Sequence, residues 1–257
     1  MASRNPVLIR ATGEKIGATE QFPAVGLGNP SDHGLDARMT LDDVIVKTGM
    51  LFAVLLAGAF FGWTTATLSV MLIAMVIGLV LGLTNSFKRE VSPALVVAYG
   101  VAQGVFIGAL SRFYNDAFAE KAPNLVSQAV LGTLVAFGVM LFMYKTGVIK
   151  VNAKFVKVFM ISMVSYLVIS VASLISTMFN SGSNWGFFGA GSLGIILCMF
   201  GVALASFSLV MDFEMIQQGI QNGLPEKESW RMAFGLTVSL VWLYTELLRL
   251  LAIFSDR

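Results

Sequence analysis

Seven long runs of apolar residues, separated by short connections, constrain the fold of this chain more than any other feature. A helix of about 20 apolar residues crosses the hydrocarbon core of a bilayer, which is about 30 Å thick. Strands of a membrane barrel would alternate polar and apolar residues over about 10 positions, and these runs do not alternate. The sequence therefore predicts an all-α integral membrane protein. The expected spans are about 46–63, 68–85, 93–113, 125–144, 155–179, 187–216 and 230–254.

Charge and cysteine content narrow the possible partners. Charged residues make up 12% of the chain, about half the share of a soluble domain. The formal net charge of +2 indicates no polyanionic partner, so we expect no binding of nucleic acid. Cys198 is the single cysteine, so no intramolecular disulfide can form.

Residues 1–43 are predicted to form a flexible cytoplasmic tail ahead of a transmembrane domain over 44–257. The first 40 residues contain three prolines and five glycines, a composition that favours disorder. They lack the apolar segment of a signal peptide. Thr40 is expected to cap the first helix, with Asp43 in its first turn.

The basic residues of the connections predict the orientation. Cytoplasmic connections are enriched in lysine and arginine, and 13 of the 17 basic residues fall on the side of the N-terminus if there are seven spans. We therefore expect a plasma (inner) membrane protein with a cytoplasmic N-terminus and its C-terminus on the opposite side. The 13 residues are Arg4, Arg10, Lys15, Arg38, Lys47, Lys88, Arg89, Lys145, Lys150, Lys154, Lys157, Lys227 and Arg231.

Small residues recur every four positions on the second and third spans. Such faces allow close packing of helices in lipid, so we interpret these glycines as structural. Tyr99 and Gln103 flank the glycine face of the third span and are candidates for lining a cavity. For Gln103 a hydrogen bond to a neighbouring helix is the favoured interpretation. The two faces are Ala74, Gly78 and Gly82, and Gly100, Gly104 and Gly108.

Four ionisable residues in the last two spans are difficult to assign to connections. Asp212 and Glu214 lie at the inner end of the sixth span, and Glu246 and Arg249 lie within the seventh. A charge at mid-bilayer costs at least about 2.5 kcal/mol, so such groups usually face the bundle interior or water. Glu246 could form an internal ion pair with Arg249, three residues on, or could titrate or contact a cation. Asp212 could also reach headgroup water, which is the favoured interpretation of Glu214.

The segments 211–216 (MDFEMI) and 242–251 (WLYTELLRLL) resemble the C-terminal signature of the Bax inhibitor-1/YccA family. The segment from Ser92 to Gly108 is similar to that family's third helix. The resemblance implies seven helices, with the last one central and wrapped by the other six. Some members are pH-sensitive calcium leak channels, in which an acid late in the sixth helix and an acid in the seventh share a proton and close the pore. These positions correspond to Asp212 and Glu246.

A carboxylate pair of this kind has a clear physical basis. Two carboxylates in a poor dielectric cannot both ionise easily, so they titrate as a unit, and when deprotonated they offer oxygen ligands to a cation such as Ca²⁺. Arg249 is the first candidate for a counter-charge and Arg89 the second. Because the two acids are 34 positions apart, their contact requires residues 224–233 to form an interfacial turn, with the last helix starting near Phe234.

Other functions find little support. The lysines lie at span ends or in connections, which excludes a retinal site, and His33 is the only histidine, so metal and protease motifs are absent. We expect no enzyme and no cofactor beyond transient Ca²⁺. Two classes remain open: a proton-gated cation leak, and a non-conducting protein that binds other membrane proteins, such as a membrane protease.

Overall fold

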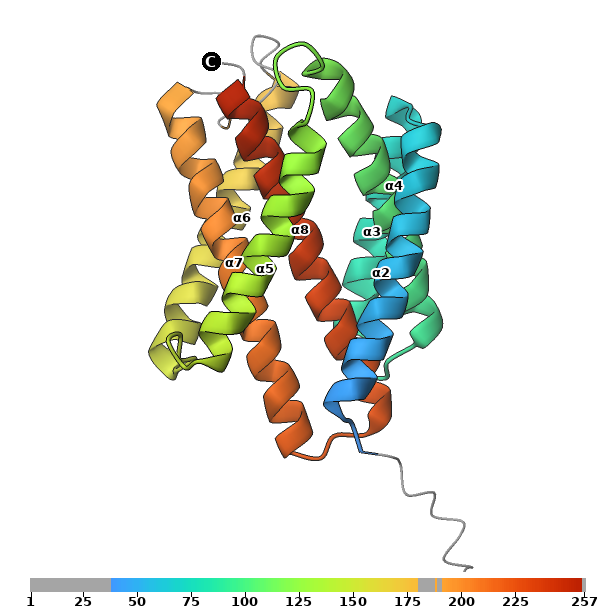
Figure 1. Cartoon of the computed structure of the whole chain (residues 1–257), viewed down its shortest axis with the longest axis vertical. Helices are drawn as coiled ribbons and strands as arrows, with labels where there is room; N and C mark the ends of the chain where they lie inside the picture. Colours follow the sequence, from blue (N-terminus) through green and yellow to red (C-terminus); the bar gives the residue numbers. More distant parts are fainter. Residues whose placement is uncertain (1–37, 180–187, 189–190, 256–257) are drawn as a thin grey trace, which may run out of the picture. The chain divides into compact units, whose positions relative to one another are not determined.

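The computed structural model describes residues 38–179, 188 and 191–255. Seven helices in this part of the chain are long and apolar enough to cross a membrane (Figure 1). They confirm the predicted all-α class and lie within a few residues of the predicted spans. The helices are α2 (Leu41–Thr64), α3 (Leu68–Phe87), α4 (Pro93–Ala117), α5 (Leu125–Lys145), α6 (Ala153–Phe179), α7 (Gly191–Gln221) and α8 (Ser229–Ser255), with a short 3-10 helix, η2 (Glu226–Glu228), before α8.

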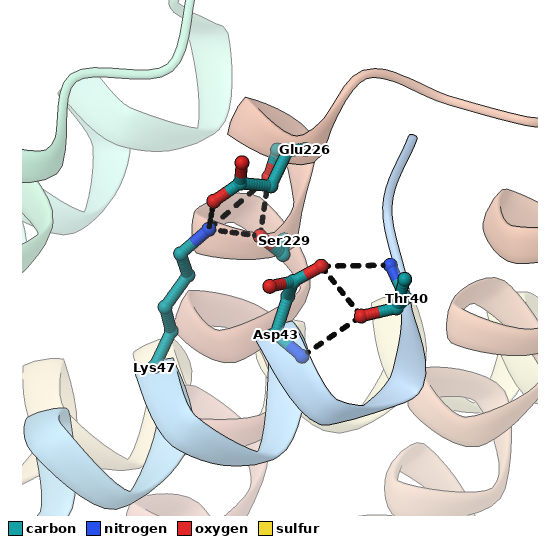
Figure 2. A network of polar contacts seen from close by, with 5 residues as sticks. All are labelled: Thr40, Asp43, Lys47, Glu226 and Ser229. Carbon is teal, nitrogen blue, oxygen red and sulfur yellow. Dashed lines mark hydrogen bonds and ion pairs between the residues drawn. The ribbon is translucent and has the colours of Figure 1, made fainter. Parts of the chain in front are cut away.

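The start of α2 has the predicted cap. The hydroxyl of Thr40 accepts a hydrogen bond from the backbone N–H of Asp43 at 3.2 Å, and the carboxylate of Asp43 accepts one from the N–H of Thr40 at 3.0 Å (Figure 2). This reciprocal arrangement is a capping box. The helix therefore begins at Leu41, so residues 41–43 of the predicted tail belong to α2, while residues 1–37 lie outside the described part of the chain.

Glycines allow α2 and α4 to pack with their backbones in contact. A β carbon on Gly58 of α2 would lie 2.8 Å from the carbonyl oxygen of Val101. One on Gly108 of α4 would lie 2.7 Å from the carbonyl carbon of Ala59. The structural interpretation of this glycine face is confirmed, since larger residues would push the two helices apart.

The last helix packs closely against four others: α2, α4, α5 and α7. Figure 1 shows α8, in red, crossing behind α5. Leu243, Leu248 and Ala252 on α8 have no exposed surface. The remaining two helices pack mainly elsewhere, α3 against α4 and α6 against α7. Four of the other six spanning helices therefore pack closely on α8.

The turn between α7 and α8 is shorter than predicted. Gly223 ends α7 with a positive φ of 64°, a conformation suited to glycine at a helix C-terminus. Only residues 222–225 separate α7 from η2, and α8 begins at Ser229. The expectation of an interfacial turn over 224–233 is therefore wrong beyond Glu228, and α7 extends five residues past the predicted end at residue 216.

Contacts with other elements explain why the charged residues there can be helical. The Nε of Arg231 lies 2.7 Å from the carboxylate of Glu228, and its Nη2 donates to the carbonyl oxygen of Arg89 at 2.7 Å. Lys47 of α2 pairs with Glu226 at 2.9 Å and donates to the hydroxyl of Ser229 at 2.7 Å (Figure 2). These partners compensate the charges of the segment that was predicted to form an interfacial turn.

Candidate functional site: two separate acids between the last helices

Two glycines define how α7 and α8 face each other. A β carbon on Gly201 of α7 would lie 2.7 Å from Oε2 of Glu246. A β carbon on Gly235 of α8 would lie 3.4 Å from Oδ1 of Asp212. Glu246 is therefore level with Gly201, and Asp212 is level with Gly235. Gly201 and Asp212 are eleven residues apart on α7, which corresponds to about 16 Å along the helix.

The structure does not bring Asp212 and Glu246 together, so the expected carboxylate pair is not formed here. The physical reason is the short turn between the helices. Since α7 continues to Gln221 and α8 already begins at Ser229, the antiparallel register places Asp212 beside the first turns of α8. Contact between Asp212 and Glu246 would require α8 to start later, near Phe234, as was predicted from the sequence.

Glu246 is buried and surrounded by donors. Its side chain is 4% exposed. Its Oε1 accepts hydrogen bonds from the hydroxyl of Tyr166 at 2.8 Å and from Nε1 of Trp242 at 3.1 Å. Nη1 of Arg249 lies 3.4 Å from Oε2, which confirms the expected ion pair within α8. This carboxylate is therefore compensated as an anion.

Arg249 links the carboxylate to a polar cavity. Its side chain is 29% exposed, and its guanidinium lies 4.7 Å from the ring centre of Phe188, a favourable cation–π arrangement. The cavity beside Arg249 and Glu246 has a volume of about 680 Å³ between α6 and α8. Its polar lining residues also include Tyr114, Tyr166, Ser170, Ser173, Thr177 and Thr245.

Asp212 has the opposite environment. Its residue is 6% exposed, and Oδ2 has no hydrogen-bond partner among the described residues. The side chain of Ser239 on α8 lies beside the carboxyl group. A buried carboxylate usually needs several donors or a counter-charge, so Asp212 is poorly compensated as an anion. It is also too buried to be the water-exposed interfacial acid that the sequence left open.

Glu214, two residues after Asp212 on α7, contacts the end of α5. Its carboxylate accepts a hydrogen bond from the hydroxyl of Tyr144, the penultimate residue of α5, at 3.0 Å. It also accepts one from the side-chain amide of Gln218 at 2.8 Å. Asp212, two residues earlier on α7, therefore lies near the level at which α5 ends.

Apolar side chains fill the layer between the two acids. Ala205 and Leu209 of α7 and Leu240 and Leu243 of α8 are buried in one cluster. The polar cavity at Glu246 has none of these four among its lining residues. The described residues therefore form a closed layer across the α7–α8 interface, with one acid on each side of it.

The other candidate residues from the sequence either pack against neighbouring helices or lie on the surface. The side chain of Tyr99 packs edge-on against Phe234 with ring centres 4.9 Å apart, and Gln103 lies against Gly78 of α3. Neither lines the cavity at Glu246. Arg89 is exposed, and no ion pair joins it to either acid in the described ranges.

Sequence reasoning missed three polar partners of the acids. Trp242 precedes Glu246 by four residues on α8, and this helical spacing is a signal that could have identified it. Tyr166 and Ser239 lie on α6 and α8 without any such local relation to the acid that each contacts. Only the packing of the helices reveals these two contacts.

Across residues 38–179, 188 and 191–255, the structure has the seven long apolar helices typical of an integral membrane protein, with two separate carboxyl groups between the last two. A family model described as Bax inhibitor 1 like matches residues 5–256. The chain therefore belongs to the Bax inhibitor 1 like family, as its last two helices suggested. Comparison with curated proteins gives no match.

Proposed function

We propose that this protein is a proton-sensitive cation leak that passes calcium, that Asp212 controls it, and that this structure corresponds to its closed form. The proposal gives the two acids different roles. Asp212 changes charge with pH, whereas Glu246 holds α6 and α8 together beside the polar cavity. The single observation that carries it is the buried Asp212 Oδ2, which has no hydrogen-bond partner among the described residues.

The charge of Asp212 would act on the packing of α7 against α8. A protonated carboxyl group suits the environment of Gly235 and Ser239, because it carries no net charge. A deprotonated one lacks a counter-charge there, since none of the described lysines or arginines forms an ion pair with it. Separation of the two helices, with entry of water or a cation, would relieve this cost. We therefore expect flux to rise as pH rises.

A path for ions is supported by the order of features along the α7–α8 interface. Glu246 lines the polar cavity between α6 and α8, apolar residues of α7 and α8 lie between the levels of the two acids, and Asp212 lies about 16 Å away from Glu246 along α7. Opening would need to interrupt the apolar layer around Leu209 and Leu243. Oxygen ligands of carboxyl groups suit a hard cation such as Ca²⁺.

The test is calcium flux into liposomes that contain the purified full chain and a calcium indicator. Asp212→Asn cannot ionise, so its flux should be independent of pH, while flux through the unchanged protein should rise from acidic to alkaline pH. Asp116→Asn is the matched control, because Asp116 is 54% exposed and pairs with Arg112 at 2.8 Å. The control should retain the pH response.

The alternative function is that of a non-conducting protein that binds other membrane proteins, such as a membrane protease. The compensated ion pair of Glu246 and the closed apolar layer favour this alternative. Absence of flux in the unchanged protein and in every variant, with folding intact, would reject the leak and support this second function.

A further inference from the structure

The connection between α5 and α6 carries an uncompensated positive charge. Lys145, Lys150, Lys154 and Lys157 fall within 13 residues, and no aspartate or glutamate occurs between Glu120 and Asp212. We call residues 145–157, which contain these four lysines, the basic hairpin. All four lysines are exposed, and none forms an ion pair with the described residues.

The backbone of the basic hairpin is held in a defined conformation. Gly147 has a φ of 72°, which ends α5, and its N–H donates to the carbonyl of Tyr144 at 3.0 Å. The N–H of Val148 donates to the carbonyl of Met143 at 3.1 Å, which completes a helix C-terminal motif. Asn152 accepts a hydrogen bond from the N–H of Phe155 at 2.8 Å and so caps α6. The lysines are therefore presented on a structured turn.

The positions of the lysines at the ends of two apolar helices are typical of the headgroup level of a bilayer. Lys145 ends one spanning helix, and Lys154 and Lys157 lie in the first turns of the next. Val148, at the tip between them, is 67% exposed. An exposed apolar tip beside long lysine side chains is typical of a segment at the interface, where the stems lie along lipid and the ammonium groups reach the headgroups.

Nearby acids do not compensate this charge. Glu214 on α7 is the acid that contacts the end of α5, and its carboxylate accepts hydrogen bonds from Tyr144 and Gln218 rather than from a lysine. A surface with four positive charges and no paired acid attracts phosphate groups, and such attraction acts over about 10 Å at 0.1 M salt.

We propose that the basic hairpin is a binding surface for the headgroups of anionic phospholipids, which contact Lys145, Lys150, Lys154 and Lys157. Basic residues beside a spanning helix strengthen binding to anionic lipid by about fivefold each near the surface. The proposal is independent of conduction, because it rests on charge and position at the end of α5 and α6.

The test places a probe at the tip of the hairpin in the full chain. A fluorophore is attached to Val148→Cys in a Cys198→Ala background, and the protein is placed in nanodiscs of phosphatidylcholine with either spin-labelled phosphatidylglycerol or spin-labelled phosphatidylcholine as quencher. We expect quenching by the anionic lipid to be at least about threefold stronger at low salt, and the preference to fall at high salt.

Variants separate charge from structure. Replacement of all four lysines by glutamine should remove the preference, whereas replacement by arginine should retain it. Lys150→Gln with Lys154→Gln should reduce it. The matched pair Lys88→Gln with Lys227→Gln removes the same charge from other connections. At 0.1 M salt this pair should leave the preference within about a fifth of its value, because the attraction of a charge is then screened over about 10 Å.

Several results would overturn the proposal. The first is equal quenching by both lipids in the protein with the four lysines. The second is a preference that remains when all four lysines are replaced by glutamine, or that is lost when all four are replaced by arginine. The third is an equal loss of the preference in the matched pair Lys88→Gln with Lys227→Gln. Competition by inorganic phosphate, at constant ionic strength, would indicate a site for free anions instead. Competition by a short oligonucleotide alone would indicate a soluble polyanion as the partner.

Discussion

Two carboxyl groups on neighbouring helices have different environments because their partners differ. Glu246 has a tyrosine hydroxyl, an indole N–H and a guanidinium around it. Asp212 has one serine hydroxyl and a free oxygen. A buried carboxyl group with several donors and a counter-charge is well compensated, and one with few donors is not. Residue type alone does not distinguish the two.

The first prediction at this scale concerns the donor on α6. Tyr166→Phe removes one hydrogen bond to the Glu246 carboxylate and keeps the ring, so the free energy of unfolding should fall by about 1–3 kcal/mol. Tyr144→Phe is the control, because Tyr144 bonds to the more exposed Glu214 and its loss should cost less than about 1 kcal/mol. Denaturation in detergent micelles measures both, and an equal loss would contradict the buried role of Tyr166.

The second prediction concerns the glycine opposite Glu246. Gly201→Ala would place a β carbon 2.7 Å from the carboxylate, so it should lower the free energy of unfolding by about 1–3 kcal/mol through overpacking. Gly138→Ala on α5 meets nothing within 4 Å and should raise helix stability by about 0.5–1 kcal/mol. The same denaturation assay compares them, and a tolerated Gly201→Ala would mean that α7 and α8 are further apart than described.

At the scale of elements, the α7–α8 hairpin is where sequence and structure differ most. The seven spans and their caps were predictable, because the length of an apolar run and residues such as Thr40 and Pro93 act locally. The register of α7 against α8 was not, because it depends on a four-residue turn and on the contacts of Gly201 and Gly235 with the opposite helix. Helix at Arg231 was not predictable either, because Lys47 and the carbonyl of Arg89, which contact Glu226 and Arg231, lie far away in the chain.

A prediction for this hairpin concerns its attachment to α2. Lys47 contacts Glu226 and Ser229 on the other side of the turn. A double-mutant cycle of Lys47→Ala and Glu226→Ala should give a coupling energy of about 0.5–1 kcal/mol. The exposed pair of Arg112 and Asp116 is the control, with an expected coupling of about 0.3–0.5 kcal/mol. Zero coupling at Lys47 would indicate that the turn is not held by this ion pair.

At the scale of the whole molecule, the lipid environment explains which structural features could be predicted from the sequence. Because spanning segments must satisfy their own backbone groups, apolar runs predict the helices without any knowledge of packing. The charged residues of the candidate site could be predicted from the sequence, but their contacts could not. Charged residues within a span stand out and identify Asp212, Glu246 and Arg249, but the contacts that give each its role arise between helices.

The orientation is a prediction at this scale. The excess of basic residues in the connections on the N-terminal side predicts a cytoplasmic N-terminus and a C-terminus on the opposite side. Reporter fusions after Arg257 and within residues 145–157 should therefore report opposite compartments, with the fusion in the basic hairpin cytoplasmic. The same compartment for both would reject seven spans, and opposite compartments with the hairpin outside would invert the orientation.

The most direct test of the central claim is a double-mutant cycle on calcium flux with Asp212→Asn and Glu246→Gln. If the two acids act separately, about 16 Å apart along the helices, Asp212→Asn should abolish the pH response and Glu246→Gln should leave it in place. The free-energy effects on flux in the double variant should then equal the sum of the single effects to within about 0.5 kcal/mol. A double variant that changes flux no more than either single variant, with both singles losing the pH response, would show that the acids share one proton and would contradict this account.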